Sequence, residues 1–101
     1  MKKLLLLAAV ALSFAAQAVT PDEILTKGGC LACHTKDKKV VGPSYKDVAV
    51  KYKGQDASVR LIEKVRKGGV GVYGPIPMPA NAIEKISDAD LKTAVDYSLK
   101  L

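Results

Sequence analysis

The stretch that decides the fold is Cys30-Leu31-Ala32-Cys33-His34, which contains both cysteines and the only histidine of the chain. Side chains three positions apart lie on one side of a helical turn, so both thiols can reach the same ligand. The imidazole that follows points at that ligand from the same side. The stretch therefore predicts a site that holds one large group at three points.

The Cys-x-x-Cys-His spacing is the attachment signature of a c-type haem, and each thiol would form a thioether with one vinyl group. His34 would then be the first axial ligand of the iron. A zinc site needs four ligands, so a carboxylate would have to complete it. A thioredoxin-like redox pair needs a preceding strand and a βαβ unit, and a disulfide across so short a loop would constrain little. We predict one haem c, attached covalently at Cys30 and Cys33.

Six-coordinate iron needs a second axial ligand, and the chain has no second histidine to supply it. Apart from Met1, the only methionine is Met78, in the segment Gly74-Pro75-Ile76-Pro77-Met78-Pro79. A lone methionine often only fills a core, but prolines on both sides fix this backbone and pre-position the side chain. A thioether ligand also favours ferrous iron and raises the reduction potential. Met78 is the predicted second ligand.

Residues 1–18 have the three parts of a secretory signal peptide. Two lysines follow Met1, residues 4–14 are apolar except for Ser13, and Ala16-Gln17-Ala18 is a small-x-small cleavage pattern. A membrane anchor is the alternative, but a span takes about 20 apolar residues. We expect export to the periplasm, one domain over residues 19–101, and no stable membrane insertion.

Composition limits both the core and the partners. Residues 19–101 contain neither Phe nor Trp, and a domain of this size has a thin core, so a wrapped haem would supply the missing apolar volume. Basic side chains outnumber acidic ones by 16 to 10, which suits an acidic protein partner. Nothing indicates nucleic-acid binding, because no basic stripe with interleaved aromatic residues is present. Lysines near the haem site form either a docking ring or a solvated face: Lys27, Lys36, Lys38 and Lys39.

Cap signals and apolar periodicity predict an all-α domain with four helices and no convincing strand. Thr20, Asp56 and Ser87 are the predicted N-caps of the first, third and fourth helices. The expected helices cover residues 21–27, 44–53, 57–67 and 88 to about 100. Residues 70–86 have no helical period and hold three glycine or proline clusters, so we expect an ordered loop there.

Three segments in this order resemble the class I cytochromes c, in particular the short bacterial periplasmic monohaem type. They are Lys27-Gly28-Gly29-Cys30-Leu31-Ala32-Cys33-His34, Val41-Gly42-Pro43-Ser44-Tyr45-Lys46-Asp47-Val48 and Gly71-Val72-Tyr73-Gly74-Pro75-Ile76-Pro77-Met78-Pro79-Ala80-Asn81. The similarity covers nearly all of residues 19–101. It implies the class I cytochrome c fold, in which the helices wrap around one covalently bound haem and a Pro-rich loop carries a ligand.

The resemblance also implies residue roles. Pro43 would offer its carbonyl to Nδ1–H of His34, which makes the imidazole a better donor. Asn81 would hydrogen-bond near the Met78 sulfur. Tyr73 stands where the short type usually has a Trp that reaches a haem propionate, and a phenol would donate from a different point. Tyr97 stands where a Trp often packs between the first and last helices, and we expect it in the core.

The expected function follows from a fully ligated iron, which leaves no open position for a substrate. We expect a monomeric electron carrier, not an enzyme, that moves single electrons between a quinol-oxidising membrane complex and a terminal oxidase or reductase. Its redox partners would present acidic docking surfaces. The alternative is a haem peroxidase or gas sensor in which Met78 is displaced, and a third possibility is a subunit held in a larger reductase.

Overall fold

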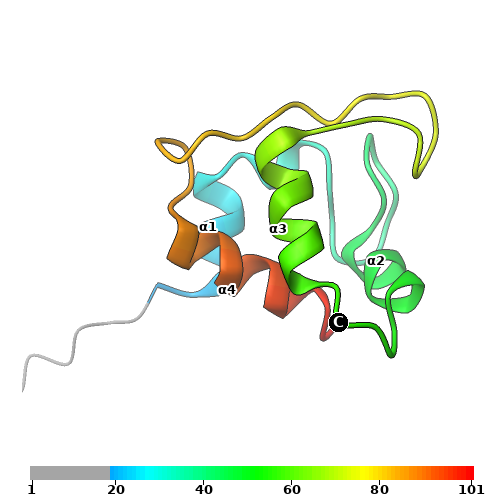
Figure 1. Cartoon of the computed structure of the whole chain (residues 1–101), viewed down its shortest axis with the longest axis horizontal. Coiled ribbons are helices and arrows are strands. Elements are labelled where there is room, and N and C mark those ends of the chain that lie inside the picture. Colours follow the sequence, from blue (N-terminus) through cyan, green and yellow to red (C-terminus); the bar gives the residue numbers. More distant parts are fainter. Residues whose placement is uncertain (1–18) are drawn as a thin grey trace, which may run out of the picture.

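The computed structural model describes residues 19–101, and the predicted signal peptide lies outside them. Over these residues the chain forms helices and loops with no strand, which confirms the all-α expectation (Figure 1). None of these helices has the length and apolar character needed to cross a bilayer. The elements are α1 (Pro21–Lys27), the 3₁₀ helix η1 (Cys30–Ala32), α2 (Tyr45–Lys51), α3 (Ser58–Lys67) and α4 (Asp88–Ser98).

Local capping sets the start of three helices. The hydroxyl oxygens of Thr20, Ser44 and Ser87 accept backbone N–H bonds three residues on, at 3.3, 3.1 and 3.2 Å. Each bond satisfies a donor that the first turn leaves free. The caps predicted at Thr20 and Ser87 are therefore confirmed.

The predicted cap of α3 is wrong. Ala57 occupies the N-cap position, and no side chain caps the helix. The start of α3 is instead tied to α4, because the Ser58 hydroxyl donates to Asp96 Oδ1 at 2.6 Å. A tertiary contact has replaced the local one that Asp56 suggested. The ends of α2 and α4, at Lys51 and Ser98, come two residues before the expected ones.

A small apolar core lies where α1 and α4 meet, with α3 beside them (Figure 1). Leu61, Ile62 and Val65 pack against this core from α3. Tyr97 is partly buried against it, as expected. The buried members are Ile24, Leu25, Tyr45, Ile86, Leu91, Ala94 and Val95.

The long segment between α3 and α4 crosses one edge of the molecule as an ordered strap (Figure 1). Its first part closes on itself: Gly69 N–H donates to Met78 O at 3.0 Å, and Met78 N–H donates to Gly69 O at 2.8 Å. Gly68 makes this possible, because its φ is +71° and a Cβ there would lie 2.5 Å from Met78 O. The strap therefore places Met78 against the end of α3.

Candidate functional site

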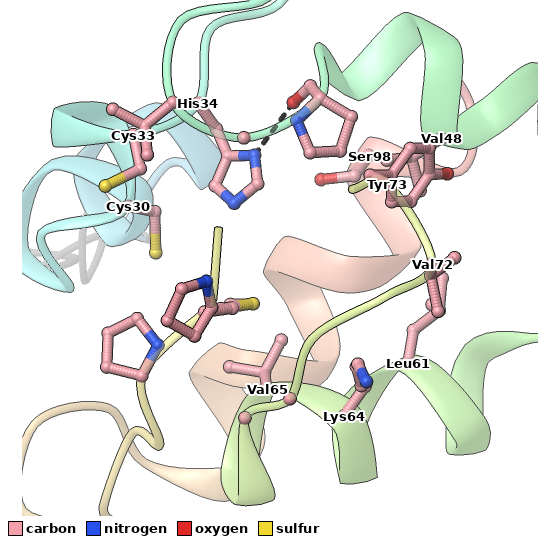
Figure 2. A pocket seen from close by; sticks show the side chains of 18 of the residues that line it. Cys30, Cys33, His34, Val48, Leu61, Lys64, Val65, Val72, Tyr73 and Ser98 are labelled. Atoms are coloured by element: carbon pink, nitrogen blue, oxygen red, sulfur yellow. Dashed lines mark hydrogen bonds between the residues drawn. The ribbon is translucent and has the colours of Figure 1, made fainter. Parts of the chain in front are cut away.

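The site is a largely apolar cavity of about 620 Å³ between the helices and the strap. Cavities that hold a cofactor-sized ligand have volumes of roughly 300–1,000 Å³. Of the seven predicted site residues, Asn81 does not line this one and the other six do: Cys30, Cys33, His34, Pro43, Tyr73 and Met78. Figure 2 shows the two cysteine sulfurs and the His34 ring on one side, with Leu61, Lys64 and Val65 of α3 on the other.

The His34 ring is held by its Nδ1 atom, which lies 2.8 Å from Pro43 O. A carbonyl can only accept, so Nδ1 carries the proton and Nε2 keeps a free lone pair. Figure 2 shows Nε2 pointing into the cavity. The hydrogen bond is the one that the resemblance implies for Pro43.

The loop behind His34 is folded tightly onto it. Gly42 N–H donates to Cys33 O at 2.7 Å, and a Cβ on Gly42 would lie 2.4 Å from His34 Cε1. The Tyr45 ring stacks on the imidazole with a centroid separation of 5.3 Å. Only glycine at position 42 lets the backbone approach the ring this closely, so the sequence Gly42-Pro43 does more than end a loop.

Both cysteines are free, half-buried thiols at the turn of η1. His34 N–H donates to Cys30 O at 2.9 Å, which closes the turn and sets the spacing of the three side chains. Burial raises the pKa of the Cys30 thiol, against a smaller opposite effect of Lys85. The thiol is therefore neutral at neutral pH, and the structure contains no Cys30–Cys33 disulfide.

The predicted loop residues differ in what they contact. Asn81 is only 6% exposed, and its amide Nδ2 donates to Val65 O at 3.2 Å and to Pro79 O at 3.0 Å. The amide therefore supports the backbone that carries Met78. The hydrogen bond near the Met78 sulfur that the resemblance implies stays a prediction.

Tyr73 lines the cavity at its rim and is 40% exposed. Its ring lies 5.5 Å from Lys51 Nζ. Partial burial, with smaller effects of Tyr52 and Asp47, raises the pKa of the phenol. Tyr73 therefore stays protonated at neutral pH and keeps a donor for a bound group.

Two basic residues of α3 were not singled out from the sequence. Lys64 is half-buried and lines the cavity, and Arg66 donates to the strap. Helical spacing predicts that residues 62 and 66 share a face, but it does not say which face meets the strap. Only the packing of α3 shows that these side chains lie near the site.

The residues present fit a covalently attached haem. The cavity walls are apolar, two free thiols lie beside it, and an imidazole nitrogen faces it with its lone pair free. Met78, which also lines the cavity, supplies a thioether. Among residues 19–101, no group of three His, Cys, Asp or Glu side chains is placed to hold a metal ion by itself.

Comparison with known proteins points the same way, although no family model matches the chain. Cytochrome c2 of Rubrivivax gelatinosus is 50% identical over 82 residues, which cover 80% of this chain and 96% of that protein. Cytochrome c-551 of Pseudomonas aeruginosa is 45% identical, with 83% of this chain and 79% of that protein covered.

Solved structures agree in fold. The crystal structure of Nitrosomonas europaea cytochrome c552 superposes with a TM-score of 0.74 at 43% identity, covering 79% of this chain and 98% of that one. Class 1 cytochrome MtoD of Sideroxydans lithotrophicus gives a TM-score of 0.67 at 34% identity, covering 79% and 90%. The chain belongs to the class I cytochromes c, which are electron-transfer proteins rather than enzymes, and it carries one covalently bound haem c.

Proposed function

We propose that this protein is a periplasmic carrier of single electrons whose haem iron is held between His34 Nε2 and Met78 Sδ. One observation carries the proposal. His34 and Met78 line the same cavity, while Nδ1–H of His34 donates to Pro43 O and leaves Nε2 as the only free ring nitrogen. When bound, haem c supplies an iron that alternates between the ferric and ferrous states.

The chain's part is to keep both ligands in place during that change. The Pro43 carbonyl fixes the orientation of the His34 ring and strengthens it as a donor. On the other side, the paired backbone bonds between Gly69 and Met78 fix where the thioether begins. The cavity walls are largely apolar, and two protein ligands leave no position for a substrate. Small geometric change and a closed site favour electron transfer over bond chemistry.

Cys30 and Cys33 would attach the haem covalently. Tyr73 and Asn81, in the strap that carries Met78, would help to hold it. We propose that residues 1–18 direct export and are removed, because haem c is joined to its protein outside the cytoplasm. Intact mass spectrometry of the natural protein tests both points. The expected mass is that of residues 19–101 plus one haem, and a chain with two alkylatable thiols would contradict the proposal.

Lysines beside the site support docking to acidic redox partners, such as a quinol-oxidising complex, an oxidase or a reductase. Lys27, Lys38 and Lys39 are exposed. Lys36 differs, because its Nζ lies 2.9 Å from Asp22 Oδ1 and 5.4 Å from the Tyr97 ring centroid. Its charge is partly compensated, so we assign the steering to the other three. An electron-transfer rate that stays constant as salt rises would contradict this role.

Replacing Met78 tests the ligand set. The ferric protein should show the weak near-infrared sulfur-to-iron charge-transfer band, and Met78→Ala should lose it and lower the reduction potential. Ile83→Ala is the matched control, since Ile83 is 56% exposed in the same strap and does not line the cavity. A ferric protein that is high-spin and lacks the band would instead support a site that binds peroxide or a small gas.

A further inference from the structure

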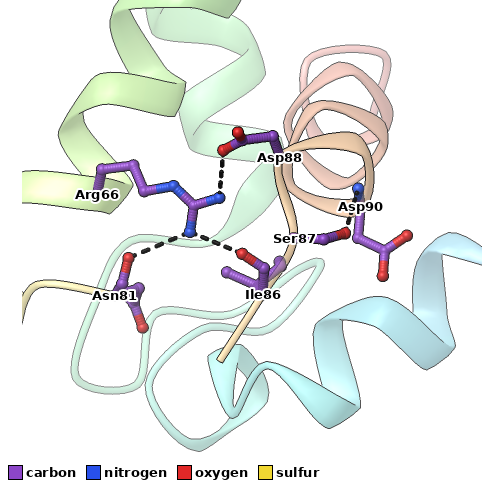
Figure 3. Close-up of polar contacts among 6 residues, drawn as sticks. All are labelled: Arg66, Asn81, Ile86, Ser87, Asp88 and Asp90. Atoms are coloured by element: carbon purple, nitrogen blue, oxygen red, sulfur yellow. Dashed lines mark hydrogen bonds and ion pairs between the residues drawn. The ribbon is translucent and has the colours of Figure 1, made fainter. Parts of the chain in front are cut away.

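Arg66 is a cation of α3 that donates to two backbone carbonyls of the strap, and none of the functions described above uses it. Its side chain, on α3, is 21% exposed. Nη1 donates to Ile86 O at 2.7 Å and to Asn81 O at 3.3 Å, while Nη2 pairs with Asp88 Oδ1 at 2.6 Å (Figure 3). One side chain therefore joins α3, the strap and the first turn of α4.

The two carbonyl acceptors lie five residues apart in the strap, so Arg66 ties the ends of the segment 81–86 to a single nitrogen. The segment is also fixed at Asn81, whose N–H and Nδ2 both donate to Val65 O on the same helix. Lys85 Nζ donates to Asn81 Oδ1 at 2.9 Å and so fixes which end of the amide faces α3. Asn81 is thus held on its carbonyl, its amide nitrogen and its side-chain oxygen.

Met78 lies three residues before Asn81. The paired bonds to Gly69 hold the strap on one side of Met78, and the Arg66 and Asn81 contacts hold it on the other. We propose that Arg66 is a positioning residue that keeps the Met78 side of the site closed by clamping residues 81–86 to α3 and α4. The clamp rests on the proposed Met78 ligation for its effect on the iron, but not for its effect on the strap.

The guanidinium suits this role because it is planar and carries five donors in a fixed fork. Bonds from a charged donor are also stronger than neutral ones. Without them, only the two Asn81 bonds to Val65 O hold the strap to α3 between Met78 and the start of α4. A segment with fewer attachments opens at a lower free-energy cost, so opening on the Met78 side should become more frequent.

Imidazole titration of the ferric holoprotein measures this opening, because imidazole binds iron only when the Met78 position is free. Its apparent affinity scales with the open fraction. In Arg66→Met we expect that affinity to rise by about tenfold or more, which is the effect expected from losing one charge-assisted hydrogen bond. Lys92→Met is the matched control, since it removes an exposed cation and an ion pair to Asp96 on α4 without touching the strap.

Amide hydrogen exchange of the ferrous protein tests the clamp independently of ligation. The Asn81 and Met78 amides should exchange faster in Arg66→Met by a larger factor than the Leu61 amide, which bonds to Ala57 O at the start of α3 and reports on the rest of the domain. Equal factors at all three amides, or an unchanged imidazole affinity with a ferric band like that of the parent, would overturn the proposal.

Two further outcomes separate the hypotheses. If imidazole binds the parent and Met78→Ala equally well, the ligand assignment fails, and the exchange factors alone then decide on the clamp. If Arg66→Met gives no holoprotein, Arg66→Lys takes its place, because one ammonium cannot reproduce the fork. Parental imidazole affinity and exchange in Arg66→Lys would overturn the proposal.

Discussion

The two sides of the cavity are built differently. On the His34 side, the contacts that fix the ring come from residues 33–45, and the nearest ones are Gly42 N–H to Cys33 O and His34 Nδ1 to Pro43 O. On the Met78 side, the contacts join the strap to α3 and α4 over 15 to 22 positions in sequence. The first side is local and becomes covalent with haem, whereas the second has one local attachment, between Gly69 and Met78, and otherwise depends on tertiary packing.

This difference predicts which side opens first. Local opening occurs most readily in regions with few buried contacts. The strap is such a region, because most of its residues from 70 to 80 are exposed. The His34 side should remain intact until the whole domain unfolds. In the proposed ligation, His34 is the fixed ligand, and Met78 is the ligand whose occupancy its surroundings can adjust.

Gly68→Ala should give the largest loss of stability, and the loss should fall on the Met78 side. At φ +71° and ψ −167°, the backbone of Gly68 adopts a conformation that costs a residue with a Cβ roughly 1–3 kcal/mol, and contact with the backbone of residues 78–80 adds about 1–3 kcal/mol of overpacking. In urea, the sulfur-to-iron band of the variant should disappear well before the helical circular dichroism signal. Loss of both signals at one urea concentration, as in a single transition, would contradict the comparison.

Gly42→Ala attacks the His34 side and should have a smaller effect. The backbone at this position is not left-handed, so only the clash with His34 Cε1 remains, at about 1–3 kcal/mol. Because the thioethers hold the haem next to His34, the band and the helix signal should be lost together. A variant in which the band is lost first would show that this side is not the more firmly built one.

Replacing Asp96 should give the smallest loss of stability. Because Asp96 lies away from both proposed ligands, it provides a baseline for the two sides of the cavity. Lys92, and then Ser58, hold the pKa of this carboxyl below its usual range. Its unfolded value is about 3.9, so the stabilisation is present above about pH 4 and is lost as pH falls through the folded pKa. For a partly exposed pair it should be under about 1 kcal/mol.

Asp96→Asn should therefore flatten the acid limb of a urea-derived stability profile. The sulfur-to-iron band at neutral pH should be unchanged from that of the parent. A shifted band would mean that the contact between α3 and α4 reaches the Met78 side after all.

Sequence reasoning was strongest where a few neighbouring residues decide the outcome. Thr20 and Ser87 cap the expected helices because a hydroxyl three residues before a free N–H needs nothing else. The same reasoning failed at Asp56, where the bond between Ser58 and Asp96 fixes the start of α3. That bond joins residues 38 positions apart, and no local pattern reveals it.

The sequence by itself determined the chemistry of one side: the spacing of Cys30, Cys33 and His34 specifies covalent haem, because three adjacent groups on one turn must face one ligand. It also determined an all-α chain with an ordered Pro-rich strap. The tertiary structure alone decided that Arg66 and the Asn81 amide hold that strap. Those contacts form only when α3, the strap and α4 pack together, and the distances between such distant residues depend on the whole fold.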